Sequence, residues 1–131
     1  MKPVNPAGWP NPRGYSNGML AENGVLFVAG QIGWDSQGKL ARGFVAQFRQ
    51  ALLNIKSVVE AAGGRTDQIG RLTWYVTDLE QYRTQAREIG AAYREIMGKH
   101  FPTMAVVEVS GLVERDALVE IEATAVLAQK A

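Results

Sequence analysis

The chain has 131 residues, of which 47% are hydrophobic and 21% are charged, and its formal net charge is +1. This length and composition predict a single globular domain over residues 1–131, and the near-neutral charge argues against nucleic-acid and membrane-surface partners. Because the chain has no cysteine and one histidine, His100, disulfides, thiol nucleophiles and a transition-metal site are not expected.

Residues 1–14 are rich in proline and lack the apolar core of a signal peptide. We expect this segment to be an extended arm rather than a targeting sequence. Nowhere does the chain approach the roughly 20 consecutive apolar residues that a membrane-spanning helix needs. The cytoplasm is the expected location.

Two short apolar runs, residues 18–22 and 25–30, flank Asn23 and Gly24. An Asn-Gly pair between such runs predicts a β-hairpin with both turn residues at positive φ. Gly30 ends the second strand, where a glycine permits close approach of the backbone to a ligand or to another chain. The glycine spacing that follows does not match a nucleotide-binding loop, so no nucleotide cofactor is expected.

Downstream of the hairpin, apolar residues recur at helical spacing and predict a helix that ends at Gly63 and Gly64. The stripe consists of Phe44, Phe48, Ala51, Leu52, Ile55, Val58, Val59 and Ala62. Residues 69–76 then alternate as a β-strand, with Trp74 on the same face as Leu72.

Asp78 predicts the N-cap of a second helix, with Gln81 as its capping-box partner, and this helix closes near Gly98. Residues 104–109 and 118–127 are the remaining predicted strands, and a turn joins them.

The predicted order is β-β-α-β-α-β-β, which indicates a two-layer α+β sandwich whose two helices cover one face of the sheet. The other face is expected to carry tryptophan and valine as well as polar residues. Burial of that face against copies of the same chain predicts a homo-oligomer. Trp9, Trp34 and Trp74 fit either an aromatic pocket or structural burial.

The last predicted strand places Glu120, Glu122 and Thr124 on one face. One interpretation is a strand whose outer face is simply in water. The other is a carboxylate held in a pocket at a subunit junction, where it orients a water molecule. The alternation of the strand does not choose between them.

A series of short segments, taken together, resembles the Rid (YjgF-type, reactive intermediate deaminase) superfamily along nearly the whole chain. The segments are Tyr15-Ser16, Phe27-Val28-Ala29-Gly30-Gln31-Ile32, Gln50-Ala51-Leu52-Leu53-Asn54-Ile55, Val76-Thr77-Asp78-Leu79, Phe101-Pro102 and Val119-Glu120-Ile121-Glu122-Ala123. The resemblance implies a chorismate-mutase-like α+β fold, a homotrimer around a central sheet barrel, and clefts between adjacent subunits that bind a small metabolite. No cofactor is expected.

In the RidA branch, the family hydrolyses imines and enamines such as 2-aminoacrylate to 2-oxo acids and ammonia. The resemblance assigns the water-handling glutamate to Glu120, and it assigns pocket positions to Tyr15 and to the backbone of Gly30. Two positions depart from RidA, since Ala29 replaces a serine and Met104 replaces the arginine that grips the substrate carboxylate.

Met104 cannot donate a hydrogen bond, whereas an arginine binds a carboxylate through two charge-assisted bonds. Leaving a substrate carboxylate unpaired in a buried pocket costs on the order of 2–5 kcal/mol. Efficient deamination of 2-aminoacrylate is therefore not expected. Met104, Val106 and Ala29 predict a pocket that is more apolar than that of RidA.

The leading hypothesis is a Rid-family hydrolase or deaminase of a small imine or enamine that lacks a deeply bound carboxylate. Glu120 would position water with a pKa raised by burial, backbone groups near Gly30 and Val106 would polarise the reacting atom, and Tyr15 would close the cleft. The alternative is a non-catalytic trimer that binds a small apolar metabolite in the same cleft. Ribonuclease activity, a third possibility, has little support from the charge or the single histidine.

Overall fold

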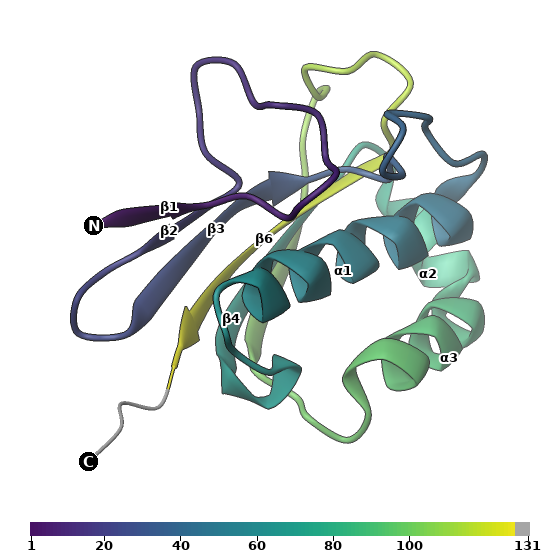
Figure 1. The fold of residues 1–131 in the computed structure, drawn as a ribbon. Coiled ribbons are helices and arrows are strands. Elements are labelled where there is room, and N and C mark those ends of the chain that lie inside the picture. The colour runs from purple at the N-terminus through teal and green to yellow at the C-terminus, as the bar shows by residue number, and fades with distance from the viewer. Residues whose placement is uncertain (128–131) are drawn as a thin grey trace.

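The computed structural model describes residues 1–127, so residues 128–131 of the predicted domain lie outside the described part. Figure 1 shows a mixed sheet with helices packed against one of its faces. In chain order the elements are β1 (Lys2–Val4), β2 (Gly18–Leu20), β3 (Val25–Gln31), α1 (Phe44–Ala61), the 3₁₀ helix η1 (Thr66–Gln68), β4 (Ile69–Val76), α2 (Leu79–Thr84), α3 (Ala86–Met97), β5 (Thr103–Glu108) and β6 (Val119–Val126). Apart from β1, η1 and the division of the second helix, this is the predicted order.

The six strands lie in the order β1-β2-β3-β6-β4-β5. Neighbouring strands are antiparallel except β4 and β5, which are parallel and are connected through α2 and α3. Helices α1 and α3 lie on the same side of the sheet (Figure 1), and no described element covers the other side. The predicted two-layer α+β sandwich is confirmed.

The core lies between α1, α3 and the sheet. The apolar stripe predicted for α1 is buried except at its last member, Ala62, and α1 packs chiefly on β6 and α3, and less on β3. Each fully buried large side chain stabilises the fold by about 1.5–3 kcal/mol relative to an exposed one. The fully buried large side chains are Phe48, Leu26, Leu52, Ile55, Ile69, Leu72, Ile121, Val58, Val59, Val76 and Val119. Because strand residues alternate, burial of this set turns the intervening residues to the uncovered face.

The predicted hairpin forms between β2 and β3, but its turn differs from the expected one. Gly24 has a φ of 93°, whereas no non-glycine residue in the described chain has a positive φ, so Asn23 does not. The Gly24 amide donates to the Ala21 carbonyl (3.0 Å), and the Ala21 amide donates to the Val25 carbonyl (2.8 Å). This is a type I turn followed by a left-handed glycine, which needs positive φ at one residue only.

The proline-rich segment is not the extended arm that we expected. Its first residues form β1 at the edge of the sheet, where Pro3 removes no hydrogen bond that a central strand would need. Residues 5–17, here named the arm loop, then return the chain to β2. The ends of this loop are held together, because Asn5 Oδ1 accepts hydrogen bonds from the backbone amide and from Nδ2 of Asn17, each at 3.0 Å.

The predicted second helix is divided at Gln85, whose φ and ψ are −112° and 23°. Asp78 caps α2 as predicted, since its side chain accepts a hydrogen bond from the Glu80 amide at 3.0 Å. The capping box was wrong, because Gln81 Oε1 is buried with no hydrogen-bond partner among the described residues. The side chains of Thr84 and Gln85 donate to carbonyls one turn earlier, at 2.8 and 3.3 Å, and such bonds compete with a straight continuation of the helix.

The uncovered face of the sheet does not carry the expected tryptophan. Trp74 is buried beneath the helices, where its ring centroid lies 4.6 Å from that of Phe48. Its strand partner across β4 and β5 is Val106, so Val106 also faces the helical layer. The uncovered face instead exposes Phe27 and Val107, which are 49% and 41% exposed. The predicted apolar character of this face is therefore confirmed for valine and not for tryptophan.

Candidate active site

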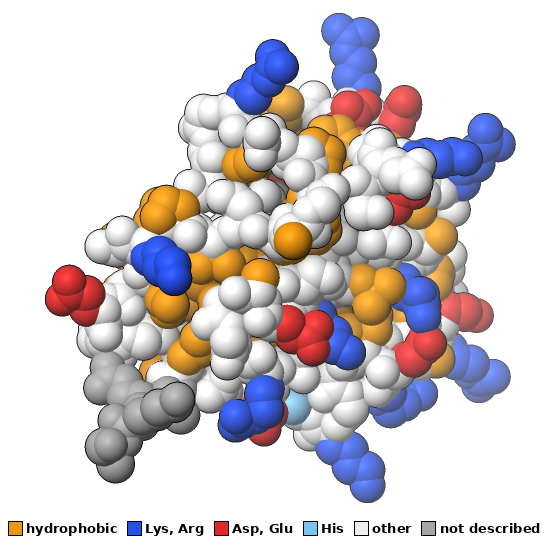
Figure 2. All heavy atoms as spheres, viewed as in Figure 1, with side chains coloured by type: hydrophobic (Ala, Val, Ile, Leu, Met, Phe, Trp, Pro, Cys, Tyr) orange, Lys and Arg blue, Asp and Glu red, His pale blue; other side chains and the backbone are white. Residues whose placement is uncertain are grey.

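A cleft of about 660 Å³ lies between the arm loop, the end of β3 and the segment that precedes β6. Its lining residues are Trp9, Pro10, Asn11, Pro12, Arg13, Tyr15, Asn17, Gly30, Gln31, Ile32, Trp34, Asp35, Gly38, Asn54, Val113, Glu114 and Glu120. Figure 2 shows hydrophobic side chains gathered over the part of the surface that the arm loop forms. A cleft of this size and lining is typical of small-molecule sites.

Glu120 reaches the cleft from β6. Its neighbours Val119 and Ile121 are fully buried in the core, so the alternation of the strand turns the Glu120 side chain to the opposite face. The carboxyl group is half-buried, and this burial is the main cause of its raised pKa; the charge of Glu122 raises the pKa further. A carboxyl group with a raised pKa can exchange a proton with a substrate closer to neutral pH.

Gly30 lies beside Glu120 across the β3–β6 pair, at a point where the register of the two strands shifts between Val28 and Gln31. A Cβ atom on residue 30 would lie 2.7 Å from Cδ of Glu120. That separation is shorter than non-bonded carbon atoms allow. Because Gly30 has no side chain, the Glu120 carboxyl group can occupy this space.

A second carboxylate is fixed next to Glu120. The hydroxyl of Tyr75, on β4, donates a hydrogen bond of 2.6 Å to Glu122 Oε1, and this bond is the main cause of the raised pKa of Tyr75. Tyr75 pairs in register with Glu120, so the phenol and both carboxyl groups share the uncovered face of the sheet. The outer face of β6 is therefore partly exposed to water and partly buried, which lies between the two interpretations of this strand.

Buried amide side chains hold the backbone around the cleft. They are Asn17, Gln31, Gln47 and Asn54. Asn54 Nδ2, on α1, donates to the carbonyls of Ile32 and Trp34 at 3.0 and 2.7 Å, and its Oδ1 accepts a hydrogen bond from Gln50 at 2.9 Å. These bonds attach one wall of the cleft to the helix.

Gln47, also on α1, attaches the loop before α1 and the segment before β6 to the helix. Its Nε2 donates to the carbonyls of Ala41 and Asp116 at 3.0 and 3.1 Å, and its Oε1 accepts from the Leu118 amide at 2.7 Å. The sequence interpretation missed both helix amides. The available signal was their spacing: Gln47 and Asn54 lie two helical turns apart within an apolar stripe, where a polar side chain needs partners.

The structure brings together only part of the predicted site. Tyr15, Gly30 and Glu120 line the cleft, and Ala29 lies next to Gly30 on β3 without lining it. Met104 and Val106 lie on β5, which β4 separates from β6, and neither lines the cleft of its own chain.

The tryptophans divide between the two roles that the sequence left open. Trp9 and Trp34 line the cleft, whereas Trp74 is structural. His100 lies in a loop outside the cleft, with its Nε2 2.7 Å from the Ile69 carbonyl oxygen. Arg13, which the sequence interpretation did not single out, also lines the cleft.

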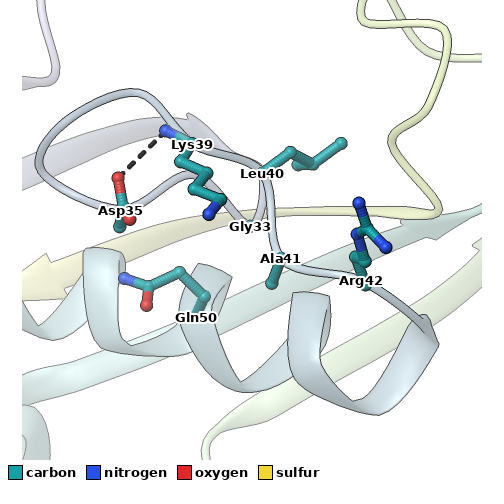
Figure 3. Close-up of a pocket in the computed structure, with 7 residues that line it drawn as sticks. All are labelled: Gly33, Asp35, Lys39, Leu40, Ala41, Arg42 and Gln50. Atoms are coloured by element: carbon teal, nitrogen blue, oxygen red, sulfur yellow. Dashed lines mark hydrogen bonds between the residues drawn. The ribbon is translucent and has the colours of Figure 1, made fainter.

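A smaller hollow of about 270 Å³ adjoins the cleft and shares Asp35 and the adjoining loop with it. Figure 3 shows that this hollow is formed by the loop between β3 and α1, with Lys39 and Arg42 extending from it. The dashed line marks the bond from the Lys39 amide to Asp35 Oδ1, at 2.9 Å. Glu120 does not line this hollow, so the larger cleft is the better candidate.

Within residues 1–127, no three histidine, aspartate or glutamate side chains gather in a way that could hold a metal ion. None of the described helices is long and apolar enough to cross a membrane.

The structure is a two-layer α+β sandwich with a half-buried carboxyl group in a cleft. Known proteins share this fold. The family model described as Endoribonuclease L-PSP matches residues 10–127. The chain therefore belongs to this family, the Rid (YjgF-type) superfamily, and its fold is chorismate-mutase-like.

Two curated relatives illustrate the family. A RutC family protein of Pyrococcus horikoshii is 39% identical over 119 residues, which cover 88% of this chain and 90% of the relative. A 2-iminobutanoate/2-iminopropanoate deaminase of Salmonella typhimurium is 38% identical over 106 residues, covering 78% and 79%. Among solved structures, E. coli TdcF with bound serine has a TM-score of 0.83 at 30% identity and covers 98% of this chain and 100% of its own.

Proposed function

We propose that the chain is a hydrolase that deaminates small reactive imines or enamines in the cleft that contains Glu120. The observation that carries this proposal is the half-buried Glu120 carboxyl group, whose pKa is raised by burial and which shares the cleft with Tyr15. The deaminase names of relatives such as that of Salmonella typhimurium support it.

The chemistry needs one water molecule and a group that shuttles protons. An enamine first becomes an imine as a proton moves from its nitrogen to its carbon. The ionised Glu120 carboxylate takes a proton from water as the water oxygen bonds to the imine carbon, and it returns that proton to the nitrogen to give a carbinolamine. Glu120 then passes the hydroxyl proton of the carbinolamine to the nitrogen as the C–N bond breaks, so that a 2-oxo product and ammonia leave. A group that accepts and donates the same proton works best with a pKa near the working pH, which a raised carboxyl pKa approaches.

We further propose that the active form is a homotrimer in which β5 of one subunit reaches the cleft of its neighbour. Phe27 and Val107 on the uncovered face supply apolar surface for such contacts. Met104 and the backbone of Val106, which do not line the cleft of their own chain, would then contribute from the edge strand of the adjacent subunit. The solution mass tests this, with three times 14.3 kDa expected and a monomer contradicting it.

Met104 in place of arginine shifts the specificity away from 2-aminoacrylate in this proposal. The substitution Met104→Arg is expected to raise activity on 2-aminoacrylate. No gain in a folded Met104→Arg variant would show that this position does not set the specificity.

Ammonia release from freshly generated imines and enamines tests the catalytic role. Glu120→Gln keeps the size of the side chain and is expected to lower kcat by about 100-fold or more, the usual worth of a general acid–base group. Glu60→Gln, on the exposed side of α1, removes the same charge from a residue that does not line the cleft and serves as the matched control. Equal turnover by the wild type and Glu120→Gln would contradict the mechanism.

A second candidate function is non-catalytic binding of a small apolar metabolite in the same cleft. Its support is the aromatic lining by Trp9 and Trp34, together with the missing arginine at Met104. It predicts saturable binding without consumption of the ligand. Ribonuclease activity has less support, because Arg13 is the one basic side chain that lines the cleft within the described residues.

A further inference from the structure

We propose that Arg13 binds the carboxylate of the substrate and that the cleft accepts 2-imino acids with an aromatic side chain. This inference rests on the proposed function, because it concerns the same cleft and the same Glu120. It assigns to the arm loop the carboxylate anchor that Met104 cannot provide.

The first argument is the distribution of charge in the cleft. Arg13 is the one arginine or lysine among its described lining residues, whereas Asp35, Glu114 and Glu120 are acidic. The Arg13 guanidinium forms no ion pair with any residue of the range 1–127. An anionic group that enters the cleft therefore meets one cation with unused donors, and a guanidinium can bind a carboxylate through two of them.

The second argument is the way in which the arm loop presents this side chain. Arg13 precedes Gly14, whose φ of 80° is a conformation that side chains disfavour, and Tyr15 follows. Arg13 and Tyr15 both line the cleft. The two hydrogen bonds from Asn17 to Asn5 close the loop that carries Arg13 and Tyr15.

The third argument is the apolar surface that the cleft exposes. Trp34 and Tyr15 are 40% and 57% exposed although both line the cleft, and Trp9 lies on the arm loop beside them. Aromatic surface of this kind is stabilised when another ring packs on it. A three-carbon substrate would leave most of the 660 Å³ filled with water, whereas an aromatic side chain would cover these rings.

The test uses equilibrium binding of stable product analogues by calorimetry, so that it does not depend on turnover. The probes are phenylpyruvate, its methyl ester and pyruvate. The wild type is expected to bind phenylpyruvate about tenfold more tightly than the ester, in line with one charge-assisted contact, and more tightly than pyruvate. Arg13→Gln is expected to abolish the preference for the acid over the ester, and Arg13→Lys to keep part of it.

Arg42→Gln is the matched control, because it removes the same charge from the neighbouring hollow of Figure 3. It should leave the preference intact. An Arg13→Gln variant that keeps the wild-type preference, or an Arg42→Gln variant that loses it, would overturn the anchoring role. Equal affinities for pyruvate and phenylpyruvate would overturn the aromatic specificity. Glu120→Gln removes a negative charge from the cleft and should keep or increase the preference for the acid, so a failure of catalysis and a failure of anchoring are distinguishable.

Discussion

Gly30 and Glu120 occupy a shared space between β3 and β6, in which a Cβ atom on residue 30 would lie 2.7 Å from Cδ of Glu120 and 2.9 Å from its Oε1. The φ of Gly30 is not in the left-handed region, so the backbone itself does not demand glycine there. The glycine is needed for the carboxyl group next to it.

Gly30→Ala should therefore displace the Glu120 side chain while the fold is kept. Turnover is expected to fall by about 100-fold, since misplacing a catalytic group by about 1 Å can cost that much. Gly70→Ala, on β4, is the control, because its Cβ would meet only the Thr124 carbonyl oxygen at 3.9 Å. Ammonia release and circular dichroism measure the two effects. Unchanged turnover in Gly30→Ala would mean that catalysis does not require the Glu120 carboxyl group in its observed position.

The pH dependence of turnover should reveal the influence of Glu122 on Glu120. The charge of Glu122 raises the pKa of Glu120, and the proposed mechanism begins with the ionised form of Glu120. Glu122→Gln should therefore move the acidic limb of the kcat profile to lower pH. Tyr75→Phe removes the 2.6 Å hydrogen bond but leaves the charge, so its limb should move less. An identical profile for the wild type and Glu122→Gln would contradict this coupling.

The stability of the folded protein should also depend on pH through the ionisation of Glu120. Because burial raises the pKa of Glu120 in the folded state, folding favours its protonated form. Its contribution to stability is present below the unfolded-state pKa and is lost as the pH rises through the folded-state pKa. Glu120→Gln cannot ionise, so its Tm relative to the wild type should be higher at pH 8 than at pH 4. Thermal unfolding at the two pH values measures this, and a constant difference would speak against it.

Asn54 should be worth more to stability than an ordinary surface amide. Asn54→Leu would leave the part-buried carbonyls of Ile32 and Trp34 without their donor, and the free energy of unfolding should fall by about 2–4 kcal/mol. Gln50→Leu removes only the bond to Asn54 Oδ1 and is expected to cost less. Urea denaturation compares the two variants. If Gln50→Leu were the more costly, the wall of the cleft would not depend on Asn54.

The uncovered sheet face should respond to charge as a subunit contact does. Phe27→Lys places a charge on this face and is expected to lower the solution mass toward that of one chain. Ala46→Lys, on the exposed face of α1, adds the same charge on the other side of the molecule. Light scattering distinguishes these outcomes. A Phe27→Lys variant with the same solution mass as the wild type would place the contact elsewhere.

The sequence was a good guide to elements that local patterns determine. The α1 stripe and the alternation of β4 and β6 were visible because burial repeats at the period of each element. The split at Gln85 and the negative φ of Asn23 were missed, because each depends on a competing local hydrogen bond rather than on periodicity.

The candidate site was harder to predict because its parts come from distant segments. The resemblance to the family assigned Glu120, Tyr15 and Gly30 to a pocket, and the structure places all of these in the same cleft. The roles of Asn54 and Arg13 depend on which loop lies beside which strand. Pairing of this kind is non-local, and no spacing within one segment encodes it.

The closed ends of the arm loop have a consequence for the chain entropy of this region. Because the β1–β2 pair and the Asn5–Asn17 bonds join the two ends, a change of loop length that keeps Trp9 packed on the core changes mainly the closure entropy. Doubling the length of a flexible loop costs only about 0.6 kcal/mol. Insertions and deletions between Asn5 and Asn17 can therefore reshape the mouth of the cleft at little cost to the sheet.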